Sequence, residues 1–182
     1  MKQSKSKFDV VPLREDIDID RIYTEIETFV LNEDKFQDQI NDPHLSVQIC
    51  LQGIDAEMDP YFGSRTLKHI TDEGFEEEDF NIFLFSELDY TNSIIEDLNM
   101  FRTRIMITKP KTCLTLHADP RKRIHIPIET NENCFLMIDQ YAHHLSADGS
   151  AYLTDTTKLH TSINASLGNN RTHIVGVIPE MS

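Results

Sequence analysis

Tryptophan is absent from the sequence, cysteine is rare, and no long apolar run occurs. The three cysteines, Cys50, Cys113 and Cys134, are widely spaced and form no Cys-x-x-Cys pair, so neither a disulfide framework nor a zinc knuckle is expected. No apolar stretch approaches the ~20 residues that a membrane-spanning helix needs. Internal repeats and low-complexity segments are also missing. These absences favour a soluble, cytoplasmic protein with reduced thiols and no membrane partner.

Positive charge is scarce as well. The chain carries 17 Lys and Arg against 31 Asp and Glu, which gives a net charge of −14. This acidity argues against nucleic acid as a partner, because a phosphate backbone attracts a basic surface. The imbalance lies in residues 1–100, with 8 basic and 24 acidic residues, whereas residues 101–182 have 9 and 7. The second segment is therefore the better place for an anionic small molecule.

The length and composition favour one domain. Hydrophobic residues make up 39% of the 182 residues, which is enough to bury a core. We expect a single domain at residues 1–182, with a helical and acidic part at 1–100 and a β-rich core at 101–182. Residues 1–7 are polar and basic and lack an apolar segment, so we expect a frayed tail rather than a secretory signal. The sequence leaves the oligomeric state open.

Two segments in the first hundred residues predict helices. Residues 17–31 have an apolar face at helical spacing, and residues 91–99 are typical of a short helix. The expected apolar face comprises Ile19, Ile22, Ile26, Phe29 and Val30. The candidate capping residues are Asp18 or Asp20 for the first helix and Thr91 or Asn92 for the second.

Three other segments in this part have a different character. Residues 45–51 alternate like a strand, and residues 80–85 are typical of a buried strand. Residues 71–79 contain six acidic side chains and predict a solvated surface loop. A lid or substrate-binding loop is the functional alternative for this acidic segment.

The pattern changes after residue 100. Short β-branched or aromatic segments follow one another, separated by turn sequences rich in Pro, Asn and Gly. Many short strands at regular spacing indicate a β-sandwich or a barrel. The predicted strands are residues 101–108, 112–118, 123–129, 134–139, 150–155, 159–164 and 171–178.

Histidine is concentrated in this β-rich part, since six of the eight histidines lie between His117 and His173. His117 and Asp119 are two residues apart, so on a strand both side chains point to the same face. His160, on a later strand, can supply a third ligand. Two histidines and one carboxylate form the facial triad of non-haem Fe(II) oxygenases, which leaves three coordination positions open. The alternative is that His117 and Asp119 are surface residues that hydrogen-bond to solvent.

Arg171 is the second notable residue, because an arginine on an otherwise apolar strand is costly unless its charge is paired. A bidentate contact with a carboxylate, such as the distal carboxylate of 2-oxoglutarate, would satisfy it. An arginine at a strand end facing solvent, or one paired with the acidic N-terminal part, is the alternative. Arg102 and Arg104 likewise could meet an acidic substrate or pair with that acidic part.

A polar stripe is predicted on the strand at residues 123–129. Arg123, His125 and Pro127 share one face, and three isoleucines share the other. Polar side chains that face the inside of a barrel would line a site. In the opposite orientation the isoleucines would face the interior and the polar stripe would face water. The pattern alone leaves both orientations open.

Residues 102–177 resemble the aspartyl/asparaginyl β-hydroxylase-like branch of the 2-oxoglutarate oxygenases. The matching pieces are RTRIMITKPKTCLTLHAD, RIHIPIETN, HLSADGSAYLTD, HTSINAS and RTHIVG, in that order. The resemblance implies a mainly β protein with N-terminal helices, built as a double-stranded β-helix (a jelly-roll or cupin-like barrel). Residues 1–100 carry no such match.

The resemblance also implies roles for individual residues. Fe(II) would be bound by His117, Asp119 and His160, although some animal members lack the carboxylate. Arg171 would hold the side-chain carboxylate of 2-oxoglutarate, and Arg123 would lie near its other carboxylate. His125 belongs to the same motif as Arg123, and Thr108 would line the co-substrate pocket. Second-shell partners of the ligand imidazoles could be Thr161 or Asn164.

The implied activity is hydroxylation of a C–H bond by a dioxygenase that uses Fe(II), 2-oxoglutarate and dioxygen and releases succinate and CO2. The substrate would be a residue of a protein or peptide, or a free amino acid. The animal enzymes act on disulfide-bonded modules, and nothing in this sequence supports that particular substrate. A cupin-type metal enzyme that does not use 2-oxoglutarate, and a non-catalytic binding module, are the alternatives.

Overall fold

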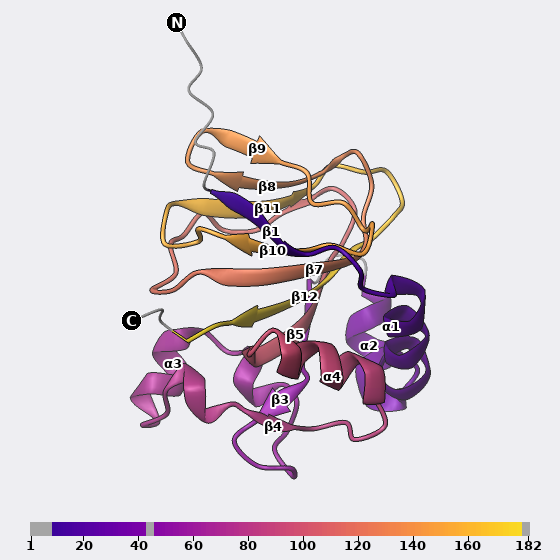
Figure 1. The fold of residues 1–182 in the computed structure, drawn as a ribbon, viewed down its shortest axis with the longest axis vertical. Coiled ribbons are helices and arrows are strands. Elements are labelled where there is room, and N and C mark those ends of the chain that lie inside the picture. Colours follow the sequence, from indigo (N-terminus) through magenta and orange to yellow (C-terminus); the bar gives the residue numbers. More distant parts are fainter. Residues whose placement is uncertain (1–8, 43–45, 180–182) are drawn as a thin grey trace, which may run out of the picture.

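The computed structural model describes residues 9–42 and 46–179. These residues form one six-stranded and one four-stranded antiparallel sheet, a small two-stranded pair, and helices that lie against the larger sheet (Figure 1). The mainly β class with a few helices is confirmed, and no closed barrel is formed within the described ranges. The tail expected at residues 1–7 lies outside them. No helix in the described part of the chain is long and apolar enough to cross a membrane.

The six-stranded sheet has strands from both parts of the chain. Its two edges, β1 and β2, come from the first hundred residues, so this part is not only helical. The strand at residues 45–51 is confirmed as β2, whereas β1 was not predicted from its sequence. In spatial order the strands are β1 (Val10–Arg14), β10 (Ala151–Thr154), β7 (Arg123–Glu129), β12 (Arg171–Val177), β5 (Phe101–Thr108) and β2 (Val47–Cys50).

The four-stranded sheet comes entirely from the second half of the chain. Its strands, in spatial order, are β6 (Thr112–Cys113), β11 (His160–Asn164), β8 (Cys134–Ile138) and β9 (Tyr141–His143). From β5 onward the chain passes repeatedly between the two sheets. The strand predicted at residues 112–118 is only partly formed, because the chain leaves β11 after Cys113 and meets it again at one isolated bridge, His117 with His160.

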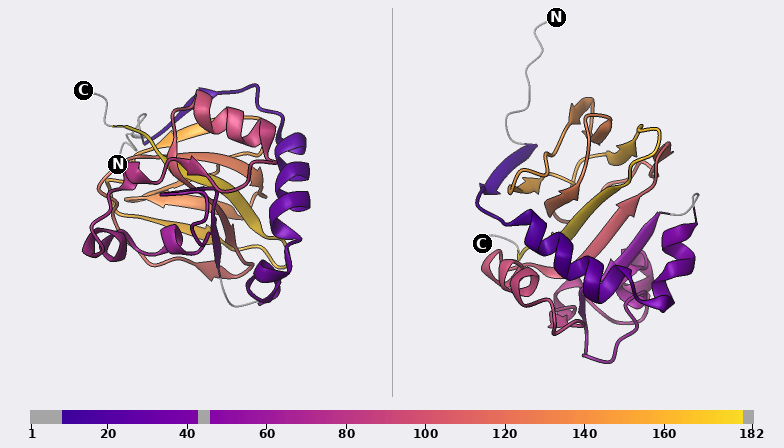
Figure 2. Two further views of the ribbon diagram at one scale, coloured as in Figure 1. Left: turned by 90° about the horizontal axis from the view of Figure 1, so that it is seen from below. Right: turned by 90° about the vertical axis from the view of Figure 1, so that its right-hand side faces the viewer.

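Helices α1, α2 and α4 contribute to the core on the outer side of the larger sheet (Figure 2), whereas α3 contributes no residue to this core. Asp18 is confirmed as the cap of α1, since its carboxylate accepts a hydrogen bond from the Arg21 N–H. Phe29, expected on the buried face, is 40% exposed, because a π-helical turn at Glu27–Leu31 shifts the helical register there. The α-helices are α1 (Ile19–Ile26), α2 (Asp34–Asn41), α3 (Leu67–Asp72) and α4 (Asp89–Asp97).

Helix α4 begins two residues before the predicted capping positions. Leu88 occupies the cap and provides no side-chain hydrogen bond. The Glu25 carboxylate of α1 replaces a local cap, because it accepts hydrogen bonds from the backbone N–H groups of Tyr90 (3.0 Å) and Thr91 (2.8 Å). A cap supplied by another helix leaves no signal in the local sequence, which explains the wrong prediction of Thr91 or Asn92.

The two faces of the larger sheet are both buried, but against different partners. Ile124, Ile126 and Ile128 pack in the main core with Ile22 and Ile26 of α1. The opposite, polar face of the same strands lines a cavity that also receives side chains from the smaller sheet. The polar stripe therefore faces the interior, and the isoleucines are covered by helices rather than by the second sheet.

The segment predicted as a strand at residues 80–85 and the acidic segment before it both differ from expectation. Only β4 (Ile82–Phe83) is extended, paired with β3 (Gln52–Gly53), although Phe80 and Phe85 are buried as expected. Residues 71–79 are not a simple surface loop, because they contain the end of α3 and a 3-10 helix at Glu77–Asp79.

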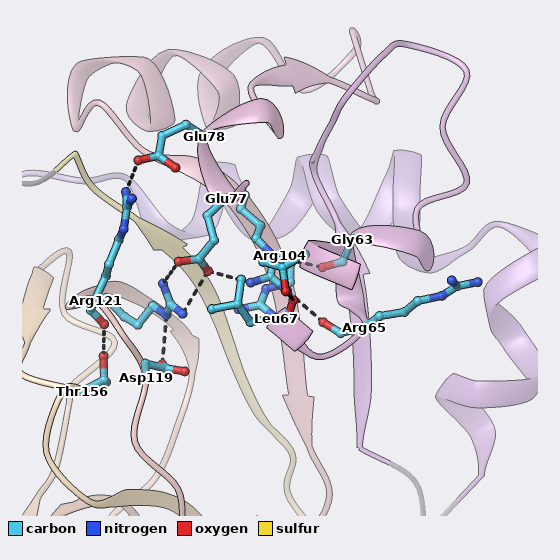
Figure 3. A network of polar contacts seen from close by, with 12 residues as sticks. Gly63, Arg65, Leu67, Glu77, Glu78, Arg104, Asp119, Arg121 and Thr156 are labelled. Atoms are coloured by element: carbon cyan, nitrogen blue, oxygen red, sulfur yellow. Dashed lines mark hydrogen bonds and ion pairs between the residues drawn. The ribbon is translucent and has the colours of Figure 1, made fainter. Parts of the chain in front are cut away.

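Glu77 is the buried member of this acidic segment, with only 3% of the residue exposed. Its carboxylate pairs with the Arg102 Nη1 atom at 2.6 Å and with the Arg123 Nη2 atom at 3.0 Å (Figure 3). The Nε atom of Arg123 contacts the Asp119 carboxylate at 3.0 Å. A chain of four charged groups thus connects the acidic segment, β5 and β7.

We expect Glu77→Ala to lower the free energy of unfolding by about 3–5 kcal/mol, because Arg102 and Arg123 would lose their shared carboxylate in the interior. Urea denaturation followed by circular dichroism measures this change. Glu78→Ala is the matched control, since the neighbouring Glu78 is 46% exposed and pairs with Arg121 at the surface. Its removal should cost less than about 1 kcal/mol. Equal losses in the two variants would contradict the role given to burial.

His173 makes a second prediction about stability. It is fully buried, neither ring nitrogen has a hydrogen-bond partner, and burial, with the charge of Arg171, holds its pKa well below 6.5. Below about pH 6.5 the unfolded chain therefore binds a proton that the folded chain does not, and stability falls as the pH decreases. We expect His173→Leu to lose less stability than the wild type between pH 7 and pH 5 in urea titrations. His69→Leu, at an exposed position, is the control, and equal losses in wild type and His173→Leu would refute the assignment.

Candidate active site

A cavity of about 250 Å³ lies between the two sheets. Its walls come from β5, β7 and β12 of the larger sheet, from β8 and β11 of the smaller sheet, and from the segment that leads into α3. Six of the seven residues singled out in the sequence line it, and Thr108 does not. The six are His117, Asp119, Arg123, His125, His160 and Arg171.

Backbone pairing brings the three expected ligands together. The N–H of His117 donates to the His160 carbonyl at 3.1 Å, and the N–H of His160 donates back to the His117 carbonyl at 2.8 Å. The N–H of Asp119 donates to the Thr156 carbonyl at 2.8 Å, on the segment before β11. Potential ligand atoms of His117, Asp119 and His160 all lie within 4.8 Å of one another, a spacing at which one metal ion could contact all three.

Both ligand imidazoles have a defined tautomer. The Nδ1 atom of His117 lies 2.7 Å from the Thr115 carbonyl, and that of His160 lies 3.0 Å from the Lys158 carbonyl. A carbonyl only accepts, so each Nδ1 carries the proton and each Nε2 keeps its lone pair free for a metal. The two Nε2 atoms lie 4.0 and 3.8 Å from the Asp119 carboxylate.

The second-shell partners differ from those expected. Thr161 donates to the Leu114 carbonyl, and Asn164 donates to the carbonyls of Thr108 and Asn169, so neither hydrogen-bonds to a ligand imidazole. Both residues are neighbours of His160 on β11, but the ring of His160 is oriented by main-chain atoms instead. Second-shell contacts through the backbone are not visible in side-chain types, which is why sequence reasoning named the wrong groups.

The two histidines differ in their exposure to solvent. His117 has 47% of its side chain exposed, whereas His160 has 7%. Burial lowers the pKa of His160 below its usual value of 6.5 and so favours the neutral imidazole that a metal requires. The candidate metal site is therefore open on the side of His117 and closed on the side of His160.

Arg123 lines the cavity, but its guanidinium already has partners. It contacts Asp119 through Nε and Glu77 through Nη1 and Nη2. It therefore orients the carboxylate of a candidate metal ligand and is itself held by the acidic segment. Sequence reasoning missed Glu77 because a buried paired carboxylate and a solvated one have the same signature in a single sequence.

Arg171 has no such compensation. Only 3% of the residue is exposed, its Nη2 atom has no hydrogen-bond partner, and within the described ranges no carboxylate lies within 4.0 Å of it. Burial lowers the pKa of Arg171 to about 10, so the group remains a cation at neutral pH. Thr108 is its neighbour across the strands, buried but outside the cavity wall, with its carbonyl bonded to Asn164.

Three further polar atoms in the cavity wall lack hydrogen-bond partners. They are the Nε atom of Arg104, the Nδ1 atom of His125 and the hydroxyl oxygen of Ser162. Burial, together with the charge of Arg171, holds the pKa of His125 well below 6.5, so this imidazole is neutral. Ser162 was not singled out in the sequence, although it lies two residues after His160 and so on the same face of the strand. Unsatisfied donors and acceptors around one cavity indicate a polar ligand.

The model of the aspartyl/asparaginyl beta-hydroxylase family matches residues 83–176, which is more than half of the chain. None of the curated proteins compared with the chain matches it significantly. The matched segment begins before the resemblance recognised at residues 102–177 and includes α4. It contains His117, Asp119, His160 and Arg171. The chain belongs to the aspartyl/asparaginyl beta-hydroxylase family.

Proposed function

We propose that this protein is an Fe(II)- and 2-oxoglutarate-dependent dioxygenase that hydroxylates a C–H bond of a protein residue or a free amino acid. Membership of a hydroxylase family supports the reaction type. The observation that carries the proposal is the combination, in one cavity, of the ligand group of His117, Asp119 and His160 with the unpaired cation of Arg171.

The donor set fits a non-haem iron centre. Two imidazole nitrogens and one carboxylate on one side of an octahedral ion leave three positions for other ligands. Both Nε2 lone pairs are available because the Nδ1 atoms donate to carbonyls. Zinc sites of the structural type would instead use four protein ligands and leave no open position. His117, Asp119 and His160 are therefore the residues that would hold Fe(II).

The polar groups in the rest of the cavity fit 2-oxoglutarate. Arg171 would bind the distal carboxylate through its free N–H groups, with the Ser162 hydroxyl as a further donor. The neutral His125 could contact the same co-substrate. Arg123 would act through Asp119, because its guanidinium is already shared between Asp119 and Glu77.

The strand order supports a double-stranded β-helix for the second half of the chain. From β5 to β12 the chain alternates between the larger sheet, with the order β5-β12-β7-β10, and the smaller one, with the order β6-β11-β8-β9, except that the consecutive strands β8 and β9 pair within the smaller sheet. This alternation is typical of jelly-roll folds, in which two antiparallel sheets face each other. We further propose that residues 1–182 act as one oxygenase domain, since β1 and β2 complete the larger sheet at both edges.

The residues of the chain have separable tasks in this reaction. When bound, Fe(II) with dioxygen and 2-oxoglutarate would supply the oxidising power, with succinate and CO2 as the co-products. Arg171 would fix one end of 2-oxoglutarate, and the backbone-held imidazoles would fix the metal, so that the reacting groups meet in one orientation. The apolar wall of Met106, Val175 and Leu136 would exclude water from the interior.

Metal binding should be visible without turnover. Mn(II), which can replace Fe(II) in such sites, at about 100 times its dissociation constant should stabilise the fold by about 2.7 kcal/mol. For a protein of this size that is a rise in melting temperature of ~5–10 °C. We expect His160→Ala to remove the rise and His69→Ala, at an exposed position outside the cavity, to retain it. A wild-type protein that melts at the same temperature with and without Mn(II) would exclude the metal centre.

Succinate formation tests the co-substrate. Purified protein with Fe(II), ascorbate, 2-oxoglutarate and air should release succinate slowly even without another substrate, and His160→Ala should not. Arg171→Leu should raise the KM for 2-oxoglutarate by roughly 10- to 100-fold, because a charged hydrogen bond contributes about 1.5–3 kcal/mol. Arg14→Leu, which removes a surface arginine paired with Asp16 and Asp97, is the control. An unchanged KM in Arg171→Leu would overturn the role given to Arg171. A wild-type protein that binds Mn(II) but releases no succinate and shows no further stabilisation by 2-oxoglutarate would favour a cupin-type metal enzyme that does not use it.

A further inference from the structure

Arg104 is, after Arg171, a second buried arginine in the cavity wall for which the described residues provide no carboxylate partner, and the proposed reaction has not given it a role. Only 9% of the residue is exposed. Its Nη1 atom donates to the Gln48 side-chain carbonyl at 3.1 Å, and its Nε atom has no hydrogen-bond partner. Within residues 9–42 and 46–179 no carboxylate lies within 4.0 Å of its guanidinium, although the chain is strongly acidic.

Arg104 differs from the neighbouring arginines, because their charges are paired with carboxylates. Arg102 and Arg123 share Glu77, and Arg123 also contacts Asp119. The two carboxylates of this network are thus already assigned to two guanidinium groups. Burying a charge without a partner costs free energy. A ligand with an anionic group would therefore form an ion pair with Arg104 that no group of the protein already makes.

Arg104 and Arg171 lie in different parts of the cavity. In the strand register Arg171 pairs with Thr108, whereas Arg104 pairs with Val175, four residues further along β12. At ~3.3 Å per residue, the two positions are about 13 Å apart along the strand. In the same sheet Arg123 pairs with Val177, two residues beyond Val175, so Arg104 lies nearer than Arg171 to Arg123 and to its partner Asp119. Burial, with the charges of Arg102 and Arg123, lowers the pKa of Arg104 to about 10.

The surroundings of Arg104 suit a small organic anion. Gln48 accepts from Arg104 through its side-chain carbonyl and also lines the cavity, so its amide group could donate to a second oxygen of the anion. Leu67, Met106 and Val175 line the same cavity and provide apolar surface for a carbon skeleton. The wall at Leu67 is held in place, because Arg102 donates to the carbonyls of Gly63 and Arg65.

We propose that Arg104 binds a carboxylate of the molecule that is hydroxylated, so that the prime substrate is an acid. The proposal rests on the proposed function for the identity of the reaction, but the binding site can be tested without it. A planar guanidinium whose Nε atom lacks a partner matches a carboxylate, and the backbone position of Arg171 lies about 13 Å further along the strand. The carboxylate can belong to a free amino acid or to an acidic side chain of a peptide.

The test measures binding to matched pairs of probes. Calorimetric titrations use wild-type protein, alone and with Mn(II) and 2-oxoglutarate. The first set comprises the twenty free L-amino acids and their α-amides, and the second comprises N-acetyl-aspartic acid α-amide with N-acetyl-asparagine α-amide. We expect at least one acid to bind at least ten times more tightly than its uncharged amide. A response in the first set identifies an α-carboxylate, and a response in the second identifies an acidic side chain.

Two substitutions connect this binding to Arg104. Arg104→Leu should weaken binding of the acid at least tenfold, and Arg104→Lys should weaken it less, because the charge remains. Both variants should retain the rise in melting temperature that Mn(II) and 2-oxoglutarate produce together. Arg14→Leu is the matched control and should bind the acid like the wild type. Arg104→Leu should melt no lower than the wild type, since it replaces an unpaired buried charge by an apolar side chain.

The outcomes separate this proposal from the proposed function. Acids and amides that bind equally, an acid that Arg104→Leu still binds, or a complete lack of response to every acid would each overturn the role of Arg104. Loss of the 2-oxoglutarate response in Arg104→Leu would also overturn it and assign the residue to the co-substrate. If wild-type protein does not respond to Mn(II) and 2-oxoglutarate, the proposed function fails, while the titrations of the metal-free protein still decide the acid site.

Discussion

The buried carboxylate of Glu77 is the group on which the arrangement of the cavity depends. It lies between Arg102 of β5 and Arg123 of β7, two strands that are separated by β12 in the larger sheet. Ion pairs of this kind require good geometry, because both charges have lost their hydration. The acidic segment is therefore fixed against the sheet, and through Arg102 so is the wall of the cavity at Gly63 and Arg65.

This network also divides the cationic groups of the cavity into two kinds. The charges of Arg102 and Arg123 are neutralised by Glu77 and Asp119, and these two arginines have a structural role. Arg104 and Arg171 are left with unsatisfied donors at two separate places on the inner face of the sheet. Glu77 is thus the acidic residue of the N-terminal part that pairs with arginines of the cavity wall. The cavity keeps an excess of positive charge in a chain whose net charge is −14.

Much of the second half could be predicted from sequence, because its strands alternate with period two and are separated by clear turn residues. The strands beginning at Phe101, Arg123, Cys134 and Arg171 were expected within one residue of their observed bounds. The spacing of His117 and Asp119 likewise indicated side chains that meet. β1 was not predictable in this way, since its partner, β10, lies more than a hundred residues further along the chain.

The remaining differences share one physical cause, which is that tertiary contacts replaced local ones. Glu25 caps α4 from another helix, so the expected cap residues were not needed. Glu77 is buried because two arginines from distant strands approach it, and a run of acidic residues in a sequence does not distinguish this case from a solvated loop. The orientation of the polar stripe also depends on the helices that cover the isoleucines. The sequence of the strand alone does not show which of its faces these helices cover.

The main-chain contacts of the two imidazoles have a consequence for how the protein can change over time. The rings of His117 and His160 are oriented by the carbonyls of Thr115 and Lys158, and the segments that carry them are joined by a pair of backbone hydrogen bonds. Since every residue type has a backbone carbonyl, the side chains at these supporting positions can mutate freely without turning the ligands. The cavity wall can therefore diverge while the orientation of the His117 and His160 rings is inherited unchanged.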